Sequence, residues 1–169
     1  MDINPLHLLK AMEEIGVPQF RGMKFTDFNT WYYMNCLLHK DGAYDIAYGR
    51  DECMLSGLAC GAKGSIGNGF NFSPGIYQRL RRAFYAGDMA TARLEQSRAN
   101  AVTNILGDGN FGGYLPTARA MYELKSGLAL GPPRMPLAPI TAEQRAALDA
   151  ELKRIGFYEW CNDVKVEVQ

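Results

Sequence analysis

Tyr44-Asp45-Ile46-Ala47-Tyr48 is a short run of aromatic and aliphatic residues that ends before a glycine, and this pattern predicts a β-strand. Similar runs occur at residues 19–25 and 64–68. Segments with helical spacing separate the three runs, at residues 26–39 and 54–59. Strands that alternate with helices in this way pair in parallel through right-handed crossovers. The first half of the chain therefore predicts an α/β fold with a parallel sheet.

Helix signals enclose this alternating part of the chain. Asn4-Pro5 predicts a helix start, and Ser73-Pro74 predicts the start of another helix that ends near Gly87. After this point no strand-like run interrupts three helical segments, which span residues 88–106, 117–126 and 141–155. The last of them begins with a capping box, Thr141-Ala142-Glu143-Gln144.

Three parallel strands would leave two open sheet edges and one face without a packing partner. A closed barrel of alternating strands and helices needs roughly 250 residues, whereas this chain has 169. We therefore expect the C-terminal part of a TIM (β/α)8 barrel in residues 1–87, with its last three strands and their helices. A three-helix C-terminal extension follows in residues 88–169. A flavodoxin-like open sheet is the alternative, but such folds rarely end in three consecutive helices.

The chain is electrically neutral, with 18 Lys and Arg residues against 18 Asp and Glu residues. This balance argues against a general nucleic-acid binder and against a protein held on anionic lipid. The basic cluster Arg79, Arg81 and Arg82 is then expected on a solvated or subunit-contact face. No stretch reaches the roughly 20 apolar residues of a membrane span, and no export signal is evident at the N-terminus. We therefore expect a cytoplasmic protein that contacts no membrane.

The four cysteines form no Cys-x-x-Cys pair, and the chain has only two histidines. A tetrahedral zinc site cannot be assembled from the usual ligand spacings in this sequence. Nothing in the sequence points to a catalytic Cys-His pair. We expect reduced thiols that behave as small apolar residues at Cys36, Cys53, Cys60 and Cys161.

Lys24 is the first candidate for chemistry, because it closes a strand-like run at the end that leads into the next helix. In (β/α)8 barrels the active site is built on that face. A lysine that faces the barrel interior loses water, so that part of it is neutral amine and can attack a ketone. The alternative is a lysine whose head reaches solvent at the strand end, and spacing alone favours this alternative.

Gly49-Arg50-Asp51-Glu52 stands where the next strand gives way to a helix. Two adjacent acceptor side chains after a glycine can bind the hydroxyl groups of a polyol. The alternative is that Asp51 and Glu52 only occupy a first helical turn, where the helix dipole favours acids, and position alone favours this alternative. The glycine-rich segment around Lys63 does not match a phosphate-binding loop, because glycine follows the lysine where serine or threonine is required.

Four motifs extend these candidates over essentially the whole chain. They are Arg21-Gly22-Met23-Lys24-Phe25-Thr26-Asp27, Tyr48-Gly49-Arg50-Asp51-Glu52, Gly61-Ala62-Lys63-Gly64-Ser65-Ile66-Gly67 and Gly131-Pro132-Pro133-Arg134-Met135-Pro136-Leu137. In order and spacing they resemble the C-terminal part of the N-acetylneuraminate lyases, which are dihydrodipicolinate synthase-like class I aldolases. The resemblance implies a TIM-barrel lyase that splits sialic acid into N-acetylmannosamine and pyruvate. It also implies no cofactor or metal and, as is common in the family, a homotetramer.

The resemblance gives individual residues a role. Lys24 matches the family lysine that forms a Schiff base with the keto carbon of the open-chain sugar, and Thr26 matches a substrate-contacting hydroxyl position. The protonated imine then acts as the electron sink when the carbon–carbon bond breaks.

The remaining matched positions concern the far end of the sugar. Gly49, Asp51 and Glu52 match the positions that hold its polyhydroxy tail. This match favours sialic acid over the substrate of the dihydrodipicolinate branch, which has no such tail. Asn68 stands where the family usually has serine, and its amide can still donate and accept hydrogen bonds.

Other parts of the family site have no match in this chain. The loop that binds the substrate carboxylate and the tyrosine that shuttles the proton lie on earlier strands, and Met1 stands where the family's fifth helix begins. We therefore expect a truncated or partial gene product with little or no turnover. A non-catalytic half-barrel subunit and a sibling aldolase for another 2-keto acid are the alternatives. If the chain is an aldolase of this family, the Lys24 amine must lie in a pocket that excludes water, on the same rim as Asp51 and Glu52.

Overall fold

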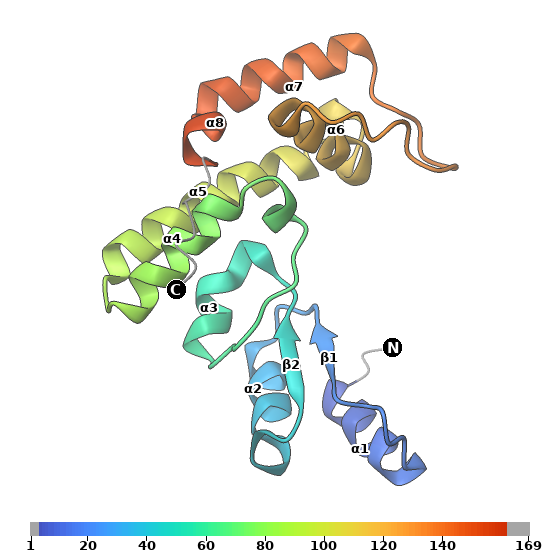
Figure 1. The fold of residues 1–169 in the computed structure, drawn as a ribbon, viewed down its shortest axis with the longest axis vertical. Coiled ribbons are helices and arrows are strands. Elements are labelled where there is room, and N and C mark those ends of the chain that lie inside the picture. The colour runs from blue at the N-terminus through green and yellow to red at the C-terminus, as the bar shows by residue number, and fades with distance from the viewer. Residues whose placement is uncertain (1–3, 162–169) are drawn as a thin grey trace. The chain divides into compact units, whose positions relative to one another are not determined.

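The computed structural model describes residues 4–161 (Figure 1). The chain divides into two compact units between Gly67 and Asn68, and each unit is described by itself. No helix within residues 4–161 is long and apolar enough to cross a membrane. The predicted boundary between residues 87 and 88 separates the partial barrel from the helical extension. It is not the division between these two compact units, and it stays a prediction.

The first unit alternates helices and strands in the expected order. Its strands β1 (Gly22–Phe25) and β2 (Asp45–Tyr48) pair in parallel, with Gly22 opposite Asp45 and Phe25 opposite Tyr48 (Figure 1). The helices are α1 (Pro5–Ile15), α2 (Thr30–Leu38) and α3 (Met54–Ala59), with 3-10 turns η1 (His39–Gly42) and η2 (Asp51–Cys53). The expected parallel pairing is confirmed for these two strands.

The expected third strand at residues 64–68 is reduced to one bridge, between Tyr48 and Ser65. The Tyr48 N–H donates to the Gly64 carbonyl at 3.0 Å, and the Ile66 N–H donates to the Tyr48 carbonyl at 2.9 Å. Glycine weakens a strand because it has no side chain to pack, and Gly64 and Gly67 enclose this segment. Among the described residues the sheet therefore has two strands, and the prediction of three is wrong.

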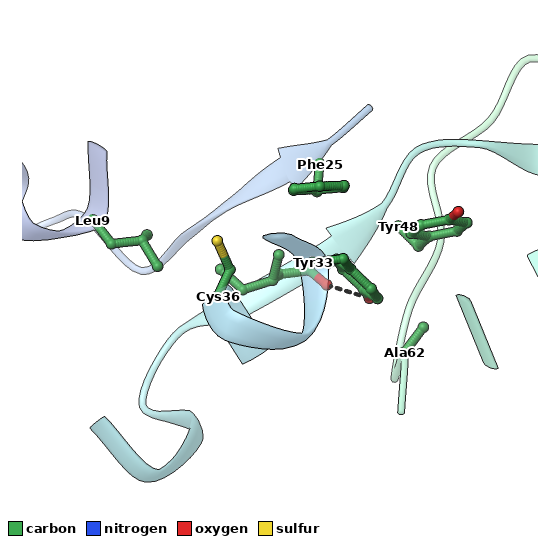
Figure 2. Packing of buried hydrophobic residues seen from close by; sticks show 7 residues of the cluster. Leu9, Phe25, Tyr33, Cys36, Tyr48 and Ala62 are labelled. Atoms are coloured by element: carbon green, nitrogen blue, oxygen red, sulfur yellow. Dashed lines mark hydrogen bonds between the residues drawn. The ribbon is translucent and has the colours of Figure 1, made fainter. Parts of the chain in front are cut away.

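One face of this sheet is covered by α2, which carries the core of the first unit. Tyr33 lies at its centre, where its hydroxyl donates to the Ile46 carbonyl at 3.0 Å (Figure 2). The Tyr33 ring lies 5.1 Å from the Phe25 ring and 4.8 Å from the Tyr48 ring, measured between centroids. The buried cluster contains Leu9, Phe25, Tyr33, Cys36, Ile46, Tyr48 and Ala62.

Capping side chains set the helix starts, although not always at the expected residue. Asn4 caps α1 as predicted, because its Oδ1 accepts from the Leu6 N–H at 3.0 Å. The helix expected from residue 26 or 27 begins instead at Thr30, after the cap Asn29. Asp27 is used in a turn, since its Oδ1 accepts from the Asn29 N–H at 2.8 Å.

The second unit contains helices and no strand within residues 68–161. The helices α4 (Pro74–Tyr85) and α5 (Met89–Gly107) lie side by side (Figure 1). The other elements are η3 (Gly69–Asn71), η4 (Gly109–Phe111), α6 (Tyr114–Ser126), α7 (Ala142–Ile155) and α8 (Phe157–Trp160). The three long helices of the predicted extension are α5, α6 and α7, and α8 was not anticipated. The start of α6 precedes the predicted residue 117, because a proline is tolerated in the first helical turn.

A buried carboxylate joins the helices of this unit. Glu95 is 2% exposed, and it accepts from Arg79 Nε at 3.0 Å, Arg79 NH2 at 2.9 Å and Arg98 NH1 at 2.7 Å. Arg79 also donates to the Trp160 carbonyl at 2.7 Å. The prediction of a solvated face is therefore wrong for Arg79, while Arg81 and Arg82 are exposed.

Candidate active site

Lys24 lies on the face of β1 that is opposite the core. Alternation along the strand turns Met23 and Phe25 toward the buried cluster and leaves Lys24 on the other side. Within the part of the chain that the structure describes, the sheet contains only β1 and β2, so no further strands surround that face. Lys24 is exposed. The expectation of a lysine shielded from water is therefore wrong for this chain, and the solvent-reaching alternative holds.

Gly49 brings two of the predicted residues together at the carboxyl end of the sheet. Its N–H donates to the Phe25 carbonyl at 2.7 Å, which continues the ladder past β2. A Cβ atom added to Gly49 would lie 2.8 Å from Lys24 Cε and would overlap Thr26 Oγ1. Glycine is required here because the lysine and threonine side chains occupy the space of a side chain at this position.

Asp51 and Glu52 follow on the same edge, in the turn η2 that leads into α3. The carboxyl ends of parallel strands meet at one edge, so both acids share the rim with Lys24, as the assignment requires. Asp51 is only 7% exposed, and a Cβ added to Gly67 would lie 2.8 Å from Asp51 Cγ. A carboxylate that served the helix dipole alone would stay in water, so the burial of Asp51 favours a more specific role.

Glu52 is half-buried and is oriented by a cation. Arg50 NH1 lies 3.2 Å from Glu52 Oε1, and the Arg50 guanidinium stacks over the Phe28 ring at 4.0 Å from its centroid. Burial and the neighbouring Asp51 carboxyl raise the pKa of Glu52, and Arg50 opposes this shift. The contacts of Arg50 with Glu52 and Phe28 were not predicted, although an arginine two residues before a glutamate is a signal for the ion pair.

A buried hydroxyl beside this site was also missed. Tyr48 is 1% exposed, and its hydroxyl has no hydrogen-bond partner among the described residues. Burial raises the pKa of Tyr48 to about 12, so it stays protonated at neutral pH. Its aromatic character marked it only as a strand residue.

Asn68, the last of the predicted positions, begins the second unit. Its Oδ1 and its backbone carbonyl accept from Asn71 Nδ2, at 3.4 Å and 3.0 Å. Its Nδ2 is buried and has no hydrogen-bond partner within the described residues. The amide thus keeps one donor for a further group.

The described residues hold no metal-ligand cluster of the usual composition. Across residues 4–161, no three His, Cys, Asp or Glu side chains gather as ligands. What the rim offers is a primary amine, a hydroxyl and carboxylate acceptors, which suits a carbonyl and polyol ligand.

Known proteins resemble the chain over most of its length. The Dihydrodipicolinate synthetase family is matched over residues 5–155. The N-acetylneuraminate lyase of Mus musculus is 32% identical over 142 residues, which cover 83% of this chain and 44% of the mouse protein. The N-acetylneuraminate lyase of Xenopus tropicalis is 37% identical over 131 residues, covering 77% of this chain and 41% of that protein.

A solved structure gives the same comparison in three dimensions. The Proteus mirabilis N-acetylneuraminate lyase superposes with a TM-score of 0.84 at 31% identity, covering 92% of this chain and 51% of that chain. The chain thus spans about half the length of the relatives that it matches.

Proposed function

Because the chain belongs to the dihydrodipicolinate synthetase family, we propose that it supplies the Schiff-base lysine and the polyol-binding residues of a lyase. The substrate is N-acetylneuraminate, and the products are N-acetylmannosamine and pyruvate. The observation that carries the proposal is the gathering of Lys24, Thr26 and Gly49 at the carboxyl end of the sheet. The proteins named N-acetylneuraminate lyase among its relatives support the choice of substrate.

Lys24 is the proposed nucleophile. Its Nζ attacks the keto carbon of the open-chain sugar, and loss of water leaves a protonated imine. A base then removes the proton of the hydroxyl group next to the carbon–carbon bond that breaks. The carbon–carbon bond breaks, its electron pair moves into the imine to form an enamine, and the sugar leaves as an aldehyde. Protonation of the enamine carbon and hydrolysis of the imine release pyruvate and restore the amine. Thr26 is the proposed substrate contact beside this carbon, and the support for it is that Thr26 Oγ1 and Lys24 Cε both lie around Gly49.

Asp51 and Glu52 are the proposed acceptors for the hydroxyl groups of the sugar tail. Each carboxylate oxygen can accept more than one hydrogen bond, so the pair can receive the hydroxyl donors of a polyol beside the partners that it already has. This pairing supports N-acetylneuraminate over a sibling 2-keto acid that lacks the tail.

The exposure of Lys24 favours a second candidate function, a non-catalytic half-barrel subunit. An exposed lysine has no water-excluding pocket that would hold a substrate carbonyl against its amine. For the same reason we expect little or no turnover from the purified 169-residue chain. A rate near that of a full-length relative would contradict this expectation.

Borohydride trapping separates the two candidates. The chain is incubated with pyruvate and reduced, and the adduct is located by peptide mass spectrometry. A stable adduct at Lys24 that is lost in Lys24→Arg supports the lyase, and Lys40→Arg is the matched control because Lys40 is exposed in the same unit. The absence of an adduct, or adducts spread over the exposed lysines, would contradict the lyase and favour the non-catalytic half-barrel subunit.

The substrate is tested through the acidic pair. With the adduct as readout, N-acetylneuraminate should compete with pyruvate for Lys24, and Asp51→Asn or Glu52→Gln should weaken that competition by about tenfold. Trapping of pyruvate itself should change little in the same variants. Better competition by aspartate semialdehyde than by N-acetylneuraminate would assign a sibling aldolase.

A further inference from the structure

A pocket of about 430 Å³ lies within the second unit, where α6, the start of α7 and the segment between these helices meet. That segment runs beside α6 before the chain enters α7 (Figure 1). The wall of the pocket is largely apolar and includes Pro116, Ala120, Pro132, Pro139 and Ile140. None of the proposed active-site residues lines this pocket, so it raises a separate question of function.

The charged side chains of the pocket carry a net positive charge, because Arg119 and Arg145 stand against Glu123. The carboxylate is already engaged with the protein. Its Oε2 accepts from Arg145 NH1 at 2.9 Å, and its Oε1 accepts from the Leu130 N–H at 2.9 Å. One guanidinium charge is therefore not balanced by the lining, and beside an apolar wall such a charge attracts an anion more strongly than it would in water.

Both arginines keep N–H donors after their contacts with the protein. Arg119 NH2 donates to the carbonyls of Leu130 and Gly131, whereas Arg119 Nε is buried and has no hydrogen-bond partner among the described residues. Arg145 pairs with Glu123 through NH1, so its Nε and NH2 can donate to a further group. Because buried N–H groups in native proteins are nearly always paired, the Nε of Arg119 indicates a ligand with acceptor oxygen.

The start of α7 adds to the same attraction, because Thr141 and Ala142 line the pocket. The capping box uses the N–H groups of Thr141 and Gln144. Ala142 is the first residue of the helix, and no preceding turn offers its N–H an acceptor. The helix dipole favours negative charge at this end, which reinforces the two guanidinium groups.

The apolar wall decides which kind of anion fits. A phosphate or sulfate needs hydrogen-bond partners around all of its oxygens, and the prolines and Ile140 offer none. A carboxylate has only two oxygens, which match the planar fork of a guanidinium group, and its carbon chain can lie against the wall. We propose that this pocket binds a monocarboxylate with a small apolar body, held through its oxygens by Arg119 and Arg145.

This assignment does not depend on the proposed function, and its test needs no catalysis. Saturation-transfer NMR on the full chain uses isovalerate as the probe and isoamyl alcohol as the matched ligand without a charge. The methyl protons of isovalerate should be saturated, and the alcohol should bind about tenfold more weakly. Equal binding of the two ligands, or displacement of isovalerate by an equal concentration of inorganic phosphate, would overturn the assignment.

Substitution of an arginine locates the binding in this pocket. Arg145→Lys keeps a cation that can pair with Glu123 but removes the planar fork, so it should weaken isovalerate binding by about tenfold. The matched control is Arg154→Lys on the same helix, since Arg154 is exposed and donates to Glu151 away from this pocket. The control should bind isovalerate like the parent, and equal losses in both variants would overturn the location.

A further variant guards against loss of folding. Ala129 lines the pocket from an exposed position between the helices, so Ala129→Phe should fill the pocket without disturbing the core, and it should block isovalerate binding. Unchanged binding in Ala129→Phe or in Arg145→Lys would overturn the proposal. Lys24→Arg should leave isovalerate binding intact, so a failure of borohydride trapping with this binding preserved would reject the lyase and not the pocket.

Discussion

The two units of this protein bury their apolar surfaces in different ways. The first unit covers one face of its sheet with α2 and leaves the face that bears Lys24 exposed. The second unit closes on itself, because its helices turn their apolar sides together and enclose Glu95 with two arginines. A parallel sheet needs cover on both faces, whereas helices can pack with whichever neighbours follow them. We infer that the first unit has the smaller stability, and the following experiments test that difference.

The largest expected effect comes from truncating the core of the first unit. Leu9 is fully buried, so Leu9→Ala should cost about 2–5 kcal/mol of unfolding free energy. Because this unit is the weaker one, amide hydrogen exchange measured by mass spectrometry should rise throughout residues 5–67. Exchange in residues 74–160 should stay slow.

Leu8→Ala is the control for this substitution, since Leu8 is 44% exposed on the same helix and should cost much less. If Leu9→Ala raised exchange equally in both units, they would unfold as one body and the comparison would fail.

Glu95→Ala should produce the next largest effect, now in the second unit. Removal of the carboxylate leaves Arg79 and Arg98 without their partner, and their side chains are only 29% exposed. We expect a loss of about 2–4 kcal/mol, measured by urea unfolding with Trp160 fluorescence in a Trp31→Phe background. Glu159→Ala, an exposed carboxylate on α8, should stay within about 0.5 kcal/mol of the parent. A loss that small for Glu95→Ala would show that helix packing alone closes this unit.

Thr141→Ala should have a smaller effect, because it removes one capping box. The Gln144 N–H donates to Thr141 Oγ1 at 3.1 Å, and the Thr141 N–H donates to Gln144 Oε1 at 2.9 Å. Loss of such a cap costs about 1 kcal/mol, which thermal unfolding of the second unit can measure. Thr141→Ser keeps the hydroxyl group and should therefore retain most of the stability that the cap contributes. Equal thermal stability of the two variants would mean that the hydroxyl cap does not contribute to the stability of the second unit.

The smallest effect concerns pH and the first unit. Burial alone would raise the pKa of Glu13, but hydrogen bonds from Tyr44, Lys40 and His39 outweigh it and lower the pKa below the ordinary 4.5. A carboxyl with a lowered folded-state pKa stabilises above its unfolded value, and this contribution is lost as the pH falls through the folded value. Glu13→Gln should therefore weaken the pH dependence of melting between about pH 5 and about pH 3.

Glu14→Gln, at the exposed neighbouring position, is the control for the pH experiment and should melt like the parent across the same range. An unchanged pH profile in Glu13→Gln would assign the acid sensitivity of this unit to other groups.

Local signals accounted for most of the helices. Asn4-Pro5 and the box at Thr141 act through hydrogen bonds within a few residues, and both were confirmed where they were predicted. The third strand failed because a strand exists only through pairing with a distant segment, and Ser65 makes a single bridge. The start of α2 moved to Thr30 because Asp27 and Asn29 compete for the same local role, which composition alone does not rank.

The candidate site divides in the same way. The motifs around Lys24 and Gly49 predicted which residues meet at the carboxyl edge, because parallel pairing fixes that edge once the strands are known. They did not predict that Arg50 stacks on Phe28 or that Tyr48 buries its hydroxyl, since both depend on side chains that approach from other elements.

The sequence by itself determined the order of most elements, the caps at Asn4 and Thr141 and the family to which the chain belongs, because these depend on short-range hydrogen bonds and on residue identity. Only the tertiary structure decided which polar groups lose water. Lys24 stays in solvent while Asp51 and Glu95 are buried, and the three look alike as isolated charged residues. The reason is that burial is a property of what packs against a residue, and those partners lie far away along the chain.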